Sequence, residues 1–331
     1  MKIVKQSAQI LIPDEPMAHI ERIGRICYKS EDKIGDGTDA KFVKSLFKSQ
    51  HHAMLEHYRF IMQVSPVIYE PLSKVAHPYV EMTHSEFNGE DRYVISFSAR
   101  GLHNLVEDAH AEQYGYLPMA IASLRDELIA HIIKKYGCYE LFGYERDHSL
   151  LLSTGTEFIP NNRKYMSDTE WEHHGWFSTH MITDRGISHE IVRHRRQTSF
   201  AQESTRYCNY NKSGEIVVID QGFCKADALT PGLGYDKQPR YNAYSAWKEM
   251  CEMSEECYNF LIKTGAKPQM ARSVLPTCLK TEIVMTAPIY EWGHFFNLRL
   301  HGTTGTPHPL IQQLSEIVFT QMQEVFYEDE N

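Results

Sequence analysis

The chain has 331 residues, of which 42% are hydrophobic, and this size and composition predict a globular protein with one large core or two modest ones. The formal charge of −9 argues against a protein that wraps nucleic acid, because neutralising phosphate groups needs a basic surface. The seven scattered cysteines contain no Cys-x-x-Cys pair, and residues 1–20 lack a sustained apolar run. We therefore expect a cytoplasmic protein with reduced thiols, no signal peptide and no membrane-spanning segment.

Two strands are predicted on either side of a long segment in the first part of the chain, up to residue 182. Alternating apolar residues predict strands over 58–64 and 176–182. The roughly 110 residues between them carry a short predicted strand at 93–96 and a predicted helix over 117–136. We therefore expect a single domain over residues 1–331, with an inserted peripheral subdomain at about 66–175.

The second half is predicted to alternate strands with longer helices. Strands are predicted over 215–219 and 280–287, with a loop rich in glycine and proline over 223–240. Apolar residues at three- and four-residue steps predict a long helix through residues 244–261, which Gly265 ends. Further helices are predicted over 289–300 and from Pro307 onward. Together these elements predict an α+β fold in which a mixed or antiparallel sheet packs against long helices.

The densest polar segment, residues 193–207, is rich in arginine. Four arginines lie within the fourteen residues 193–206 of an otherwise acidic chain: Arg193, Arg195, Arg196 and Arg206. The guanidinium group offers a fixed fork of donors that suits phosphate oxygens, so the cluster indicates a phosphorylated ligand. The alternative is the solvated basic face of a helix, and composition does not decide between the two.

Histidines raise the alternative of a metal site. His189 and His194 are five residues apart, whereas two zinc ligands on one helix need a spacing of four, so a zinc peptidase is excluded. Neither the group around His51 nor the pair at 173–174 has supporting cysteine or carboxylate spacing. We expect no metal site.

The arginine-rich segment resembles the hallmark of the flavin-dependent thymidylate synthases. Their pattern is Arg-His-Arg, seven arbitrary residues and Ser, commonly continued as Ser-x-Arg-Tyr. Here Arg193-His194-Arg195 follows an approach over 184–192 that is similar to that of longer family members, and residues 199–210 are similar to the continuation. Further segments resemble family elements in the same order: 51–57, 265–276 with Thr281, 291–299 and 308–311.

The spacing within the motif differs from the family by one residue. Eight residues separate Arg195 from Ser204, where the family has seven. The residues before the motif match the family when the motif starts at Arg193. The residues after it match when the motif starts at His194. We infer a single extra residue near Arg196 or Gln197.

The resemblance implies an FAD-dependent thymidylate synthase that converts dUMP to dTMP. It implies 5,10-methylenetetrahydrofolate as one-carbon donor, NADPH-reduced flavin as hydride source and a homotetramer. The implied catalytic residues are Arg299, Ser204 and Arg206. The implied dUMP ligands are Glu190, Arg193, Ser204, Arg206, Arg272 and Arg299, with Glu190 standing where many relatives have Gln. The implied FAD ligands are His52, Glu56, Arg193, His194, Arg195, Arg196 and His294.

Structural interpretations stand beside these roles. Ser204 is also suited to cap a helix, Arg272 to form an ion pair, and His294 to be a core histidine. A dUMP hydroxymethylase using the same site remains open because of the extra residue, and so does a catalytically silent flavin- or nucleotide-binding module.

Overall fold

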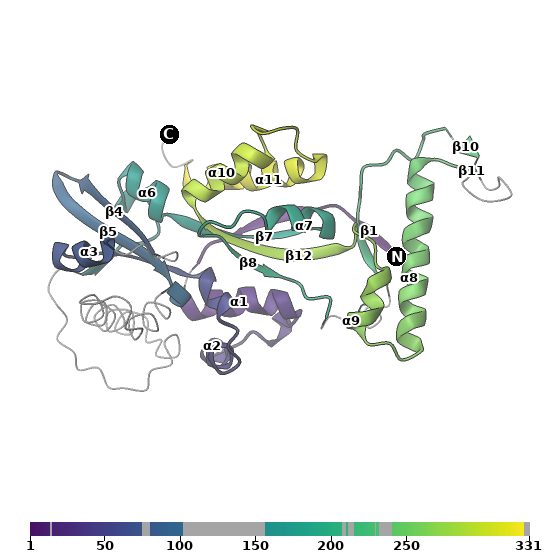
Figure 1. The fold of residues 1–331 in the computed structure, drawn as a ribbon, viewed down its shortest axis with the longest axis horizontal. Coiled ribbons are helices and arrows are strands. Elements are labelled where there is room, and N and C mark those ends of the chain that lie inside the picture. Colours follow the sequence, from purple (N-terminus) through teal and green to yellow (C-terminus); the bar gives the residue numbers. More distant parts are fainter. Residues whose placement is uncertain are drawn as a thin grey trace.

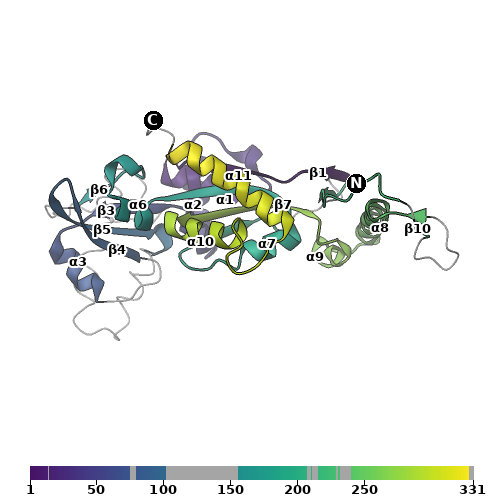
Figure 2. The same cartoon turned by 90° about the horizontal axis from the view of Figure 1, so that it is seen from above.

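The computed structural model describes residues 1–13, 15–74, 80–101, 156–206, 210, 215–228, 230–231 and 240–327. These residues form an elongated body in which a central sheet lies between two sets of helices (Figure 1). A second sheet lies at one end of the body, and the long helix α8 (Ala243–Lys263) lies at the other (Figures 1 and 2).

The central sheet has four antiparallel strands in the order β2-β7-β12-β8. Their bounds are Ser7–Leu11 for β2, Trp176–Asp184 for β7, Lys280–Pro288 for β12 and Ser199–Gln202 for β8. Strand β12 is buried along almost its whole length because it lies between two neighbours and both its faces are covered.

Helices cover both faces of the central sheet. One face carries α1 (Pro16–Tyr28), against which α2 (Thr38–Lys48) packs. The other face carries α7 (Arg185–Ile191), α10 (Ile289–Arg299) and α11 (Pro309–Phe326), as the two views agree (Figures 1 and 2). The chain belongs to the α+β class, and its central sheet is antiparallel, one of the two arrangements that the sequence predicts.

The second sheet is also antiparallel and has the order β4-β5-β3-β6. Its strands span Val80–Phe87 (β4), Glu90–Ser98 (β5), Arg59–Gln63 (β3) and Glu157–Phe158 (β6). Asn88 and Gly89 join β4 to β5 with φ of 56° and 83°, the backbone that a two-residue hairpin turn requires. Three of these strands come from the predicted insert, and β3 comes from just before it.

Short elements complete the second sheet and its surroundings. The 3-10 helix η2 (His52–His57) precedes β3, α3 (Pro66–Ser73) follows it, and α6 (Asp168–His174) packs against β4. A capping box between Ser167 and Glu170 starts α6. The 3-10 helices η1 and η5 span Glu31–Lys33 and Arg163–Tyr165.

The end that carries α8 is built from short pairings. Strand β1 (Lys2–Val4) pairs in parallel with β9 (Val217–Ile219), and β10 (Thr230–Pro231) pairs with β11 (Arg240–Tyr241). Helix α9 (Pro268–Ala271) and η7 (Arg272–Val274) follow α8 and pack against it.

Most predicted elements in the described residues are confirmed, and two predictions are wrong in detail. The last helix begins at Pro309 rather than Pro307, because the residue before a proline is pushed out of the helical region and His308 is extended. The predicted loop at 223–240 includes the short strand β10 and the first residue of β11. The predicted helix over 117–136 lies outside the described residues.

A buried row of polar side chains fastens α1 and η2 to the central sheet. His19 Nε2 lies 3.0 Å from Ser178 Oγ, Ser178 Oγ lies 2.6 Å from Thr286 Oγ1, and Thr286 Oγ1 lies 2.7 Å from His57 Nδ1. Ser178 and Thr286 face each other across β7 and β12. Three contacts in one row are all satisfied when one imidazole donates and the other accepts, so the row suits two neutral histidines.

Candidate active site

The arginine-rich segment is a turn followed by a strand, so the helix-face alternative is wrong. Helix α7, capped by Asp184 through a 2.7 Å bond to the Ile187 amide, ends at Ile191. Residues 192–198 form a turn, and β8 then adds to the edge of the central sheet along β12. The turn leaves Arg193, Arg195 and Arg196 exposed.

The last residue of α10 reaches back to this segment. Arg299 donates from Nη1 to Glu190 Oε2 at 2.7 Å, from Nη2 to the Glu190 carbonyl at 3.2 Å and from Nε to His194 Nε2 at 3.2 Å. A guanidinium group has five N–H donors, so two remain for a ligand. The structure thus brings together Glu190, His194 and Arg299, which lie up to 109 residues apart in the chain.

The protonation state of His194 follows from this contact. Arg299 Nε is always a donor, so His194 Nε2 must accept and the ring proton resides on Nδ1. Burial, followed by the charge of Arg299 and the neighbouring His294, lowers the pKa of His194 to about 4. His194 is therefore neutral at pH 7 and offers one N–H donor.

We expect Arg299→Met to raise the pKa of His194 from about 4 towards its ordinary value of 6.5, because the change removes a neighbouring cation. The pKa is measured by NMR titration of the His194 ring. Arg272→Met is the matched control and should leave this pKa unchanged. A wild-type His194 that titrates near 6.5, or an unchanged pKa in Arg299→Met, would contradict the assignment.

Helix α10 presents two further groups beside the turn. The rings of His194 and His294 lie 5.8 Å apart, and His294 is exposed, so the core-histidine alternative for His294 is wrong. Arg196 Nε lies 3.8 Å from Glu291 Oε1, while the Arg196 side chain is 87% exposed. Burial raises the pKa of Glu291. His294 and Glu291 of α10 therefore lie beside His194 and Arg196 of the turn.

A second group of predicted residues gathers after β8. Arg272 Nη1 donates to Thr205 Oγ1 at 2.9 Å, which joins η7 to the residue between Ser204 and Arg206. The Ser204 amide bonds the Cys27 carbonyl at 3.3 Å, and the Ser204 hydroxyl accepts from the Arg206 amide at 3.3 Å. The Arg206 side chain is exposed. Residues 207–209, including Cys208, lie outside the described residues.

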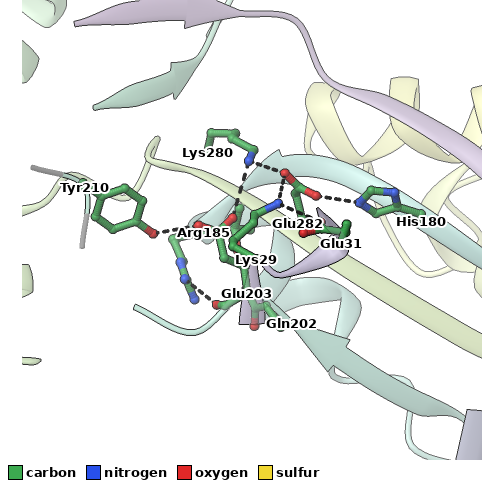
Figure 3. A network of polar contacts seen from close by, with 10 residues as sticks. Lys29, Glu31, His180, Arg185, Gln202, Glu203, Tyr210, Lys280 and Glu282 are labelled. Carbon is green, nitrogen blue, oxygen red and sulfur yellow. Dashed lines mark hydrogen bonds and ion pairs between the residues drawn. The ribbon is translucent and has the colours of Figure 1, made fainter. Parts of the chain in front are cut away.

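Glu203, directly before Ser204, is held at all four of its polar atoms. Its amide bonds the Glu282 carbonyl at 2.8 Å, and its carbonyl accepts from Arg185 Nη2 at 2.8 Å. Its carboxylate accepts from Tyr210 at 3.2 Å and pairs with Lys280 at 3.5 Å (Figure 3). These contacts fix the position of the backbone directly before Ser204.

Glu282 is the second carboxylate of this network. Figure 3 shows it between Lys280, Lys29 and His180, whose Nε2 lies 2.9 Å away. Burial acts to raise the pKa of Glu282, but hydrogen bonds from His180, Lys280 and Lys29 outweigh this effect and hold its pKa well below the ordinary value. Both carboxylates are buried and each is paired with a cation.

The third group of predicted residues lies at the start of β8. Glu56 accepts from Ser199 Oγ at 3.1 Å and pairs with Arg100. The ring of His52, also on η2, lies 5.6 Å from that of Phe47. Glu56 thus contacts the motif segment at Ser199, whereas His52 faces α2.

Sequence reasoning missed the residues that support the motif. Lys280 and Glu282 alternate on one strand, so their spacing of two was a signal that they share a face. Two other residues gave weaker signals: Arg59 is a charged residue inside an apolar strand, and Gln197 lies where we infer the extra residue of the motif. Their contacts join two sheets, and no local pattern encodes that pairing.

Comparison with known proteins identifies the family. A family model described as thymidylate synthase complementing protein matches residues 123–326, which is more than half of the chain. The chain therefore belongs to this family, the flavin-dependent thymidylate synthases.

Individual relatives match over shorter stretches. The flavin-dependent thymidylate synthase of Pyrococcus furiosus is 30% identical over 116 residues, which cover 35% of this chain and 42% of that protein. That of Geobacter sulfurreducens is 28% identical over 163 residues, covering 49% and 64%. The matched segment thus spans less than two thirds of either relative. A solved structure of the UMP/dUMP methylase PolB from Streptomyces cacaoi, bound with 5-Br dUMP, aligns over 98% of this chain and 93% of its own, with 13% identity and a TM-score of 0.40.

Proposed function

We propose that the protein is an FAD-dependent thymidylate synthase that converts dUMP to dTMP, with 5,10-methylenetetrahydrofolate as one-carbon donor and NADPH-reduced flavin as hydride source. The observation that carries the proposal is that both distant arginines contact the motif segment, Arg299 at Glu190 and His194 and Arg272 at Thr205. The segment therefore gathers cationic donors at two neighbouring places in an acidic protein.

The residues of the turn fit a flavin nucleotide. Exposed guanidinium groups at Arg193, Arg195 and Arg196 suit a pyrophosphate, and His194 and His294 offer ring donors for carbonyl oxygens. When bound and reduced, FAD supplies the hydride that completes the methyl group. The chain's own task is to hold the nucleotides, orient them and stabilise charge that develops on the uracil carbonyls.

We assign dUMP to the segment after β8, with Ser204, Arg206 and Arg272 as ligands and Arg299 and Glu190 closing the other side. Ser204, Arg206 and Arg299 touch the reacting nucleotide in this assignment. His52 and Glu56 are proposed on the flavin side, and Glu56 is already beside Ser199. We also propose that residues 1–331 form one domain with an inserted subdomain at about 66–175.

Anaerobic turnover of the purified, FAD-loaded protein with tritiated dUMP tests the function. Tritium release and a product with the mass of dTMP, dependent on NADPH and the folate, are expected. A hydroxymethyl product would replace the proposal with the sister reaction. Flavin binding without tritium release would replace it with a silent binding module.

Arg206→Ala should weaken dUMP binding roughly tenfold to a hundredfold, because a charge-assisted hydrogen bond contributes about 1.5–3 kcal/mol. Arg206→Lys should not restore binding, since lysine lacks the planar pair of donors. Calorimetric titration with dUMP measures both. FAD should stay bound in each variant, and Arg22→Ala on the exposed side of α1 is the matched control. Wild-type dUMP affinity in Arg206→Ala, or loss of FAD alone, would overturn the assignment.

We also propose a homotetramer in the cytoplasm. Exposed apolar side chains on one face of α8 support self-association: Met250, Met253 and Phe260 are 60%, 54% and 64% exposed. Within the described residues, no helix is both long and apolar enough to cross a membrane. Sedimentation velocity tests the assembly, and a monomer at micromolar concentration would contradict it.

A further inference from the structure

Gln197, at the place where we infer the extra residue of the motif, adopts an uncommon backbone. Gln197 has φ of 45°, in the left-handed region that residues other than glycine rarely occupy. It follows the exposed Arg196 and precedes β8, at the place where the spacing exceeds the family's by one. A residue held in such a conformation needs interactions that favour it.

Those interactions come from the second sheet. Gln197 Oε1 accepts from Arg59 Nη2 at 2.6 Å, and Gln197 Nε2 donates to Glu81 Oε2 at 2.6 Å. Both bonds have a charged partner, the stronger kind of hydrogen bond. The amide thus bridges a cation on β3 and a carboxylate on β4.

Each partner of Gln197 is itself anchored. Glu81 Oε1 lies 2.9 Å from His173 Nδ1 on α6, and the His173 ring lies 5.5 Å from that of Tyr290 on α10. Arg59 is 6% exposed, and burial lowers its pKa. Gln197 Oε1 is therefore a close acceptor for a buried cation, and replacing it leaves Arg59 less well satisfied.

Residues next to Gln197 contact other parts of the fold. Arg196 faces Glu291 on α10, and Ser199 bonds Glu56 on η2. The turn is closed by Thr198 Oγ1, which donates to the Arg196 carbonyl at 2.8 Å. The C-terminal part of the turn, with Arg196 directly before Gln197, is therefore held where Gln197 docks on the second sheet.

We infer that Gln197 is a positioning residue that ties the proposed flavin-binding turn to the second sheet through Arg59 and Glu81. This inference rests on the proposed function, because it assigns the turn to FAD. It gives a role to the place where the motif is longer by one residue, because Gln197 there supplies a side chain that reaches the strands of the second sheet. It also makes that sheet part of the flavin site's support.

The first test is FAD affinity of Gln197→Ala, measured by fluorescence titration beside dUMP affinity. We expect FAD binding to weaken roughly tenfold or more, as losing two charge-assisted bonds implies, while dUMP affinity changes less than threefold. Gln321→Ala is the matched control: Gln321 also makes two hydrogen bonds, to Ile10 and Ala8 of β2. It should lower the unfolding temperature and leave FAD affinity unchanged.

A swap of the two side chains separates positioning from general damage. Gln197→Glu alone sets two carboxylates against each other and should weaken FAD binding further. Adding Glu81→Gln should restore it, because the new amide donates to the new carboxylate, which also pairs with Arg59. Wild-type FAD affinity in Gln197→Ala, or a swap no better than Gln197→Glu alone, would overturn the inference. A wild-type protein that binds no FAD would instead contradict the proposed function.

Discussion

When the pH falls from 7 to 5, the free energy of unfolding should decrease by about 2 kcal/mol for each of three buried histidines. The decrease is about 1.4 kcal/mol for every pH unit below the pKa of the unfolded chain. The three are His19, His57 and His174, and burial is the first cause that lowers the pKa of each from 6.5 to about 3. His174 lies between Thr83 and Ser96, each 2.8 Å from one ring nitrogen.

The sign follows from proton uptake. Between pH 6.5 and about 3 the unfolded chain binds protons at these rings and the folded chain does not. Acid therefore favours the unfolded chain, and the stability present above pH 6.5 is lost as the pH falls through this window. In the row that joins His19 to His57, a second ring proton would also leave one hydroxyl hydrogen without an acceptor.

Urea unfolding at pH 7, 6 and 5 measures the effect. His57→Asn keeps a polar atom where Nδ1 contacts Thr286 but removes the titrating ring. It should lower the free energy of unfolding at pH 7. The further loss between pH 7 and pH 5 should then be about 2 kcal/mol smaller than in the wild type. His301→Gln replaces an exposed histidine and is the control. A free energy of unfolding that stays flat from pH 7 to pH 5 in the wild type would show that these rings are not held neutral.

Lys280→Met should lower the free energy of unfolding by about 3–5 kcal/mol at pH 7, the usual result of removing one partner from a buried ion pair. Among the residues that the structure describes, the change leaves the Glu203 carboxylate with Tyr210 as a donor and without an ion-pair partner. It also removes one of the cations around Glu282. Glu203 and Glu282 are 4% and 8% exposed, so water compensates little. Urea unfolding measures the loss.

Two comparisons sharpen this result. Lys248→Met makes the same change in the exposed pair of Lys248 with Glu252 on α8 and should leave the unfolding midpoint nearly unchanged. Adding Glu203→Gln to Lys280→Met should recover stability, since the uncompensated carboxylate is then gone. The folded pKa of Glu282 is depressed, so its contribution is present above the unfolded pKa near 4.5 and lost as the pH falls. The deficit of Lys280→Met should accordingly shrink in acid, and a deficit no larger than the control's would refute the network's role.

Local patterns in the sequence predicted the strands β7 and β12 and the helices α8, α10 and α11, but not β2, β8, α1 or α2. Strand β12 follows from a continuous apolar and β-branched run, and helix α8 follows from apolar residues at three- and four-residue steps. Neither pattern needs knowledge of partners. The family motif likewise stands in one continuous segment. The sequence predicted a helix over 289–300, and the resemblance of residues 291–299 to the family implied Arg299 as a site residue.

Pairings between distant segments could not be predicted in this way. Strand β3 pairs with β5 and β6 rather than with the central sheet, and its alternating residues fit either partner equally well. The contacts of Gln197 depend on that pairing, because Arg59 and Glu81 reach the turn only from the second sheet. The proposed contacts with dUMP and FAD involve ligands. The contacts within the chain show which side chains lie close enough together to bind the same ligand.

The first two residues of β7 connect the cores of the two sheets. Trp176 packs its ring 5.3 Å from Tyr58, in the core of the second sheet, while Phe177 stacks 4.5 Å from Trp292, in the core of the central sheet. Asn161 bonds both the amide and the carbonyl of Trp176. Adjacent residues of one rigid strand thus belong to two cores, and neither core can loosen without shifting the backbone that the other depends on. Slowly exchanging amides in both sheets should therefore share one opening free energy, that of global unfolding.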